Sequence, residues 1–185
     1  ENGRITSDGV PVAMSSAIAV VEQFVVGHAA LDQRAMAVLT PQAREAYLYS
    51  RNQLNGAPRE FLAKITKAFQ ATMALERRFA LAGGLLLAGP DPTGNGGVIP
   101  GFGDQRAIEL LVEAGFSPVE AIKVGTLNGA TYLGLADSIG SIAPGKRADL
   151  LVVKGDPSKA IADIRNVAIV FKDGVIHSST SNDPR

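Results

Sequence analysis

The sequence predicts an α/β protein that combines buried strands of a parallel sheet with a small β unit at its C-terminal end. The first observation is an almost wholly apolar run at residues 84–90, with Gly83-Gly84 at its start and Gly89-Pro90 at its end, typical of a strand buried on both faces. The second is a long amphipathic helical pattern at 59–82 that leads directly into this run. The third is a change after residue 136 to short strands separated by turns. We therefore divide the chain into residues 1–136 and 137–185.

The first part opens with a strand pattern at Val10–Ser16, followed by an apolar stretch, 17–26, that fits either a strand or a helix. Thr40 and Pro41 form a good N-cap and first-turn pair, and they predict a helix that runs to about Leu54. The next helix is predicted over 59–82. Apolar residues spaced by three and four give it one face for a core: Phe61, Leu62, Ile65, Phe69 and Met73.

A helix is predicted again at 104–114, after the loop 91–103, and Gly115 ends it. Ser117, Pro118 and Glu120 then form a capping box with proline in the first turn, which is the clearest helix start in the chain. Asn128-Gly129 predicts a break, and one more short helical turn is expected at 130–135.

The second part contains two strand patterns, at 148–153 and 167–171. Asp173-Gly174 is typical of a hairpin turn, here leading into Ile176-His177. Residues 178–185 are predicted to be a polar tail.

Composition excludes several classes of function. The 185 residues include 18 basic and 18 acidic side chains, so we expect neither a nucleic-acid partner nor an anionic membrane partner. No cysteine is present, which excludes disulfides, zinc–thiolate sites and a cysteine nucleophile. No apolar run is long enough to span a bilayer, and we expect a cytoplasmic protein. The start of the chain has neither an initiator Met nor a signal-peptide pattern, so we expect a piece of a longer protein.

Asp91, at the C-terminal tip of the apolar strand, is the main candidate for chemistry. Parallel α/β folds place their active sites at this end of the strands, where a carboxylate can bind a metal and accept a proton. The alternative is structural, because Asp-Pro-Thr-Gly is also ordinary turn chemistry. The two histidines, His28 and His177, lie far apart in the sequence, and we expect neither to act in catalysis.

Other motifs point away from familiar chemistries. The segment 140–147 nearly matches a phosphate-binding P-loop, but Arg147 replaces the Ser or Thr and a strand follows where a helix should, so a tight turn is expected. The glycine-rich loop 94–103 has no dinucleotide-binding register. Ser15 and Ser16 are not in a nucleophile-elbow motif, which disfavours a serine hydrolase.

Three stretches together resemble the C-terminal part of the metal-dependent amidohydrolase superfamily, with most similarity to its imidazolonepropionase- and prolidase-like branch. They are 85–94, which resembles the eighth barrel strand with its metal-site aspartate, 109–130, and 140–153, the most specific of the three. The resemblance implies that residues 1–136 are the C-terminal part of a (β/α)8 TIM-type barrel, about its last two β/α units. It implies that 137–185 contribute strands to a small β-sandwich, and that Val10–Ser16 is barrel strand seven.

The resemblance also implies a function. The expected reaction is hydrolysis of an amide, carbamate, urea or peptide-like bond by a metal-activated water, with Asp91 as both metal ligand and catalytic residue. The expected cofactor is a divalent metal, zinc in the intact enzyme. The loop 93–105 would cover the barrel mouth, and the residues expected to contact a small-molecule substrate are Thr93, Asn95, Phe102 and Gln105.

The first six barrel strands and their metal-binding histidines are absent from the sequence. We therefore expect this chain alone to hold no tight metal and to be inactive. Its sheet should have open edges, to be covered by the missing N-terminal barrel segment or by a second copy. Two alternatives stay open: a non-enzymatic α/β interaction module, and a small hydrolase that uses Asp91 without metal.

Overall fold

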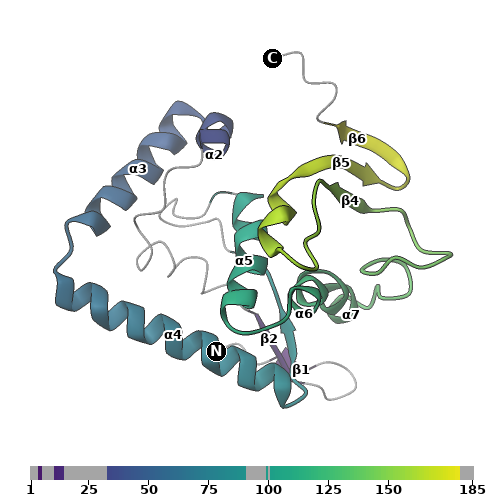
Figure 1. Ribbon diagram of the computed structural model, residues 1–185, viewed down its shortest axis with the longest axis horizontal. Helices are drawn as coiled ribbons and strands as arrows, with labels where there is room; N and C mark the ends of the chain where they lie inside the picture. Colours follow the sequence, from purple (N-terminus) through teal and green to yellow (C-terminus); the bar gives the residue numbers. More distant parts are fainter. Residues whose placement is uncertain (1–3, 6–10, 15–32, 91–98, 100, 180–185) are drawn as a thin grey trace.

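A computed structural model describes residues 4–5, 11–14, 33–90, 99 and 101–179. The described chain forms a small sheet covered by helices and a separate sheet near its C-terminal end (Figure 1). This arrangement confirms the α/β class, whereas a complete barrel or sandwich is not formed by the described residues. None of the described helices has the length and apolar character needed to cross a bilayer.

The first sheet has the order β1-β2-β3 and contains the predicted parallel pair. Strands β2 (Pro11–Met14) and β3 (Leu85–Leu87) run parallel, with Val12 opposite Leu85 and Met14 opposite Leu87. Strand β3 is shorter than the apolar run, because the backbone leaves the ladder before Gly89-Pro90. Strand β1 (Arg4–Ile5) pairs antiparallel with β2, on the edge that we expected to be open.

Helices occupy most of the chain between β2 and β3. They are α2 (Gln33–Val38), α3 (Pro41–Asn55) and α4 (Arg59–Leu81). The start of α3 confirms the predicted cap, since the Thr40 hydroxyl accepts a hydrogen bond from the Ala43 N–H at 3.2 Å.

Only part of the predicted apolar face of α4 is buried. Phe69 and Met73 are 5% and 8% exposed, as expected for core residues. Phe61 is 48% exposed, so its assignment to the core was wrong. The physical reason is position: the core is built around β3 and α5, which α4 meets through its later turns.

The main core surrounds β3. Leu86 packs with Leu111, Phe116, Ala121 and Val124, and Phe79 of α4 packs against the same cluster. Leu111 belongs to α5 (Phe102–Glu113), which begins two residues before the predicted start. The N–H of Gly101 donates to the Asp104 carboxylate at 3.1 Å, and this contact fixes the earlier start.

The predicted break at Asn128-Gly129 is wrong. Helix α6 (Pro118–Lys123) continues through a π-helical turn, η1 (Val124–Asn128), into α7 (Gly129–Tyr132). Gly129 has ordinary helical angles, φ −60° and ψ −45°, so the Asn-Gly pair does not turn the chain. Packing of Val124 and Ala130, both buried, keeps this stretch helical against the local preference of the pair.

The second sheet has the order β4-β5-β6 and is antiparallel throughout. Its strands are β4 (Leu150–Val153), β5 (Val167–Lys172) and β6 (Val175–Ser179), with the 3₁₀ helix η2 (Ile161–Arg165) before β5. The predicted hairpin is confirmed, with positive φ at both Asp173 (50°) and Gly174 (79°). Strand β6 takes in Ser178 and Ser179, which we had assigned to the polar tail.

Candidate functional site

The expected centre of the site follows β3. Asp91, Thr93 and Asn95 lie outside the described residues, so their roles stay predictions. The structure does place the strand that leads to Asp91: Leu86 and Leu87 are buried at 0% and 5% exposure. It also confirms that this strand is parallel to β2, so the two carboxyl ends meet at the same edge.

Asn128 holds β3 in place, a role that sequence reasoning missed. Its side-chain Nδ2 donates a hydrogen bond to the carbonyl of Leu86 at 2.8 Å, across 42 residues of chain. The π-helical turn that carries Asn128 packs on β3 through buried Val124. The available signal was spacing, because Ala121, Val124 and Asn128 succeed one another by helical steps of three and four.

Phe102 lies in a small apolar cluster at the first turn of α5. Its buried members are Met36 of α2 and Ile99, at 7% and 9% exposure. Leu39, Tyr47 and Phe102 pack against them and stay partly exposed. The cluster joins α2 and α3 to Ile99 and the first turn of α5, and its partly exposed surface suits contact with an apolar group.

Gln105 faces the C-terminal part of the chain in the described structure. Its Nε2 donates to the carbonyl of Ile164 in η2 at 3.4 Å, a long hydrogen bond. The structure therefore brings Phe102 and Gln105 onto the first turns of one helix but gives them different neighbours. Substrate contact by either residue stays a prediction.

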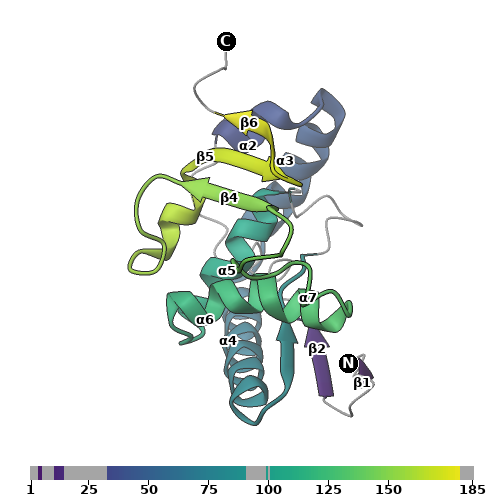
Figure 2. The same cartoon turned by 90° about the vertical axis from the view of Figure 1, so that its right-hand side faces the viewer.

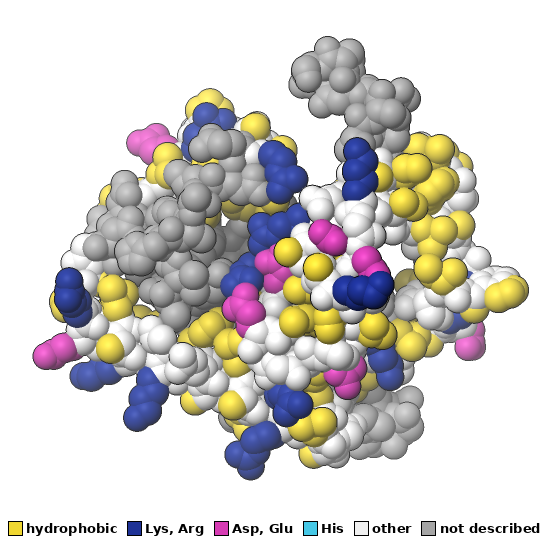
Figure 3. Space-filling view, viewed as in Figure 1, with side chains coloured by type: hydrophobic (Ala, Val, Ile, Leu, Met, Phe, Trp, Pro, Cys, Tyr) yellow, Lys and Arg dark blue, Asp and Glu magenta, His cyan; other side chains and the backbone are white. Residues whose placement is uncertain are grey.

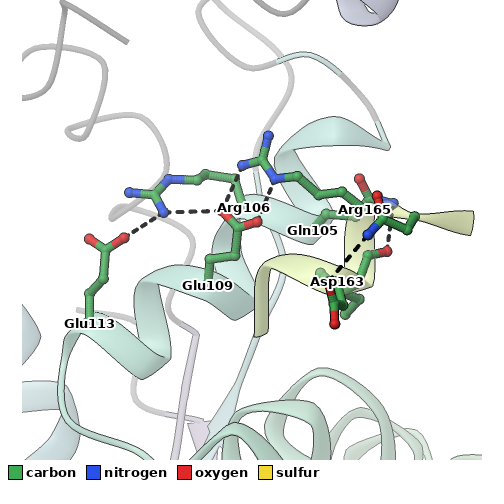
Figure 4. Close-up of polar contacts among 8 residues, drawn as sticks. Gln105, Arg106, Glu109, Glu113, Asp163 and Arg165 are labelled. Carbon is green, nitrogen blue, oxygen red and sulfur yellow. Dashed lines mark hydrogen bonds and ion pairs between the residues drawn. The ribbon is translucent and has the colours of Figure 1, made fainter. Parts of the chain in front are cut away.

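A group of four charged side chains joins α5 to η2 (Figure 4). Glu109 is 7% exposed and accepts two hydrogen bonds from the Arg165 guanidinium, one of them from Nη2 at 2.6 Å. Arg106 bridges Glu109 and Glu113, with Nη1 3.1 Å and 2.6 Å from their carboxylates. The carboxylate of Glu109 is thus held by two guanidinium groups and is not offered to a ligand.

Lys146, the lysine of the near P-loop motif, is used inside the turn. Its Nζ donates to the Ala136 carbonyl and to the Ser141 hydroxyl, the latter at 2.6 Å. Gly140 has φ +87°, and a Cβ there would lie 2.5 Å from the Cβ of Ala130, so this position requires glycine. The segment is a tight turn against α7, as expected, and its lysine is not aimed at a phosphate.

Hydrogen bonds hold the pKa values of three carboxylates below the ordinary range, those of Glu120, Asp149 and Asp156. Hydrogen bonds from the Ser117 hydroxyl and N–H, the latter at 2.7 Å, lower the pKa of Glu120 and confirm the predicted capping box. The Lys172 ammonium, 2.7 Å away, and the Asp173 N–H lower the pKa of Asp149. The Glu120 and Asp149 carboxylates thus fix the backbone at a helix start and at a hairpin turn.

The described residues contain no group of three or more His, Cys, Asp or Glu side chains that could hold a metal ion. His177 lies on β6 and is exposed, and His28 falls outside the described residues. Any metal site that includes Asp91 must therefore draw on residues outside this described set.

Comparison with known proteins points to one superfamily. The model of the amidohydrolase family matches residues 98–177. An adenine deaminase of Ligilactobacillus salivarius is 42% identical over 67 residues, which are 36% of this chain and 11% of the deaminase. The chain thus spans about a tenth of the length of this curated relative.

Solved structures match a larger share of the chain. A Bifidobacterium longum protein assigned as a prolidase aligns with 91% of this chain and 35% of its own, at a TM-score of 0.62 and 25% identity. A bottromycin amidohydrolase aligns with 89% of this chain and 36% of its own, at a TM-score of 0.69 and 18% identity. At this low identity the match is evidence for the fold alone. The family model, the curated relative and the solved structures agree, and the chain is similar to proteins of the amidohydrolase superfamily.

Proposed function

We propose that this chain is the C-terminal part of a hydrolase that cleaves C–N bonds in amides, carbamates, ureas or peptide-like substrates. The observation that carries the proposal is the buried strand β3, parallel to β2, which ends four residues before Asp91 in a chain that matches the amidohydrolase family model. The carboxyl end of such a strand is where α/β folds position reacting groups. Residues 1–136 would be the barrel part and 137–185 the sandwich part.

Asp91 is the proposed catalytic residue. Its carboxylate would accept the proton of the attacking water and pass it to the leaving nitrogen, so that the C–N bond breaks with a neutral amine as product. When bound, a divalent metal such as zinc would lower the pKa of that water. Asp91 would be one ligand of this metal, and the other ligands would come from a segment that this sequence does not contain.

The chain alone should be inactive, because β3 has a neighbouring strand on one side only among the described residues. Within the described part of the chain the sheet order is β1-β2-β3, so the far edge of β3 has no further strand. The matched structures are also about three times as long as the aligned part. We therefore expect either a further barrel segment or a second copy to cover this edge and complete the site.

The test compares residues 1–185 alone with a longer protein in which the same residues follow the N-terminal segment that completes the barrel. Hydrolysis of N-acyl amino acids, ureas and dipeptides is followed, and bound metal is measured by mass spectrometry. Asp91→Asn should lower kcat by about 10²–10⁴-fold, the usual contribution of a general acid–base. Asp137→Asn, at an exposed position outside the site, is the matched control and should leave kcat unchanged.

Full turnover by Asp91→Asn would refute the catalytic role. Activity of the 185-residue chain with stoichiometric metal would refute its dependence on a further segment. Activity without any metal would support the small metal-independent hydrolase, and binding of a partner protein without hydrolysis would support the interaction module.

Deamination of adenine is the second candidate, because several curated relatives that match this chain are adenine deaminases. This reaction also breaks a C–N bond with water, and Asp91 would have the same task in it. Adenine therefore belongs in the substrate panel. Release of ammonia from adenine, without hydrolysis of amides, would favour it over the first candidate.

A further inference from the structure

We infer that α2 and α3 form an apolar wall of the substrate pocket, and that the enzyme selects substrates with a bulky apolar group beside the scissile C–N bond. This inference rests on the proposed function, since it assumes a reacting centre at the carboxyl end of β3. Tyr47 is the residue assigned to contact the apolar group.

The first step is the place of α2 and α3 in the topology. Both helices lie between the end of β2 at Met14 and the start of α4 at Arg59. This connection of 44 residues, 15–58, is far longer than the usual 2–6 residues of a strand-to-helix loop. Long connections at the carboxyl ends of parallel strands build binding sites. Figure 2 shows β2 and β3 pointing toward the end of the molecule where α2 and α3 lie.

The second step is the contact of these helices with Ile99 and with Phe102 at the start of α5. Met36 of α2 packs with Ile99, and Leu39, Tyr47 and Phe102 pack against this pair. Ile99 precedes α5 and Phe102 begins it, and the Gly103 N–H donates to the Ile99 carbonyl at 2.7 Å. The two helices are therefore packed against Ile99 and the first turn of α5, eight and more residues after Asp91 in the sequence.

The third step is rigidity. The guanidinium of Arg44 on α3 donates two hydrogen bonds to the carbonyl of Met36, from Nε at 3.1 Å and from Nη2 at 2.7 Å. This carbonyl lies near the end of α2, where helical backbone acceptors lack partners within the helix. Arg44 thus fixes α2 on α3, so the wall is formed before a substrate arrives and little ordering is needed on binding.

The fourth step is chemistry. The cluster has four aliphatic, thioether or phenyl side chains, and its one polar atom is the Tyr47 hydroxyl. Leu39, Tyr47 and Phe102 keep part of their surface exposed. An apolar substrate group would cover this surface and release water, whereas a charged group would lose hydration without gaining a partner. Tyrosine gives such a group a broad contact at low cost in side-chain entropy.

The experiment measures kcat/KM of the complete hydrolase for N-acetyl-L-leucine and N-acetylglycine. Tyr47→Ala should lower kcat/KM for the leucine substrate at least about 10-fold, as for lost contacts of a few methylene groups, and change the glycine substrate less than about 2-fold. Tyr49→Ala is the matched control, because Tyr49 lies on the same helix at 65% exposure. It should change neither value. Equal losses for both substrates, or equal effects of the two tyrosine variants, would overturn the inference.

A binding measurement separates this inference from the proposed function. The affinity of each N-acetyl amino acid is measured by calorimetry in the Asp91→Asn background, first with Tyr47 retained and then with the added substitution Tyr47→Phe or Tyr47→Ala. Tyr47→Phe should bind N-acetyl-L-leucine like the parent, and Tyr47→Ala should bind it at least about 10-fold more weakly. Turnover that survives Asp91→Asn would refute the catalytic role of Asp91. The ratio of the affinities for the two N-acetyl amino acids would still test whether α2 and α3 line the substrate pocket. Equal affinity of the parent protein for the two ligands would refute the inference that α2 and α3 form an apolar wall of the substrate pocket.

Discussion

The core around β3 and the C-terminal sheet have similarly apolar strands but differ sharply in burial. Leu86, Leu110 and Leu111 are completely buried among α4, α5 and α6. Among the described side chains of β4, β5 and β6, none is buried, and Leu151 and Ile176 are 48% and 58% exposed. Figure 3 shows hydrophobic side chains gathered over the part of the surface that carries this sheet. Apolar strands thus become a core only where other elements cover them.

The C-terminal sheet is held mainly by directional contacts instead. Asp149 binds Lys172 and the Asp173 N–H, and the Gly174 N–H donates to the Ala148 carbonyl at 3.1 Å. These contacts fix the hairpin without burying it. Glu109 and Arg165 then join the sheet region to α5 (Figure 4). An exposed apolar sheet of this kind is expected to be covered in the complete protein.

The largest expected effect contrasts one leucine from each region. Leu111→Ala should lower the free energy of unfolding by about 3 kcal/mol, because it removes a fully buried side chain and leaves a cavity. Leu151→Ala should lower it by less than about 0.5 kcal/mol, since its side chain is half exposed. Urea unfolding followed by circular dichroism measures both. A large loss for Leu151→Ala in the isolated chain would mean that its sheet is already covered there.

A smaller but still large effect is expected where the regions meet. Glu109→Gln should cost about 2–3 kcal/mol, because it removes the buried negative charge to which the guanidinium groups of Arg165 and Arg106 donate. Glu113→Gln is the matched control on the same helix and should cost less than about 1 kcal/mol, since Glu113 is half exposed. Hydrogen exchange would show the loss first in η2 and β5. Equal effects of the two substitutions would contradict a dominant role for Glu109.

The smallest expected effect is a loss of stability in acid. One contribution comes from Glu120 beside the core around β3, and the other comes from Asp149 in the C-terminal sheet region. The folded chain lowers the pKa of Glu120 and of Asp149, so both stabilise the fold above their unfolded pKa values of about 4 and lose this contribution as the pH falls through the lower, folded values. The Ser117 and Asp173 amide signals in NMR should report these titrations, with midpoints below about pH 4. Glu120→Gln should abolish the Ser117 titration and leave that of Asp173, and Asp149→Asn should do the reverse. A midpoint at an ordinary carboxyl value would contradict the corresponding hydrogen bond.

Local chemistry was enough to predict much of the fold. The Thr40-Pro41 start, the Ser117–Glu120 capping box and the Asp173-Gly174 turn each depend on contacts between residues at most a few positions apart. The apolar run before Asp91 predicted a buried strand for the same reason, since its character is continuous in sequence. These predictions succeeded because their causes are local.

Long-range packing decided the features that were missed. The exposure of Phe61, the unbroken helix through Asn128-Gly129 and the bond from Asn128 to Leu86 all depend on how distant segments of the chain pack together. The same holds for Glu109 with Arg165 and for the apolar cluster of Met36, Tyr47 and Phe102. A local sequence pattern does not show which distant helix or strand will pack against a given face of an element.

The sequence by itself therefore determined the α/β class, the helix starts, the hairpin, the superfamily resemblance and the candidacy of Asp91. The tertiary structure alone decided that Asn128 holds β3, that Glu109 pairs with Arg165, and that α2 and α3 pack on Ile99 and Phe102. The physical reason is that capping and turn formation are settled within a few residues, whereas burial and side-chain pairing require segments that are distant in the chain to meet.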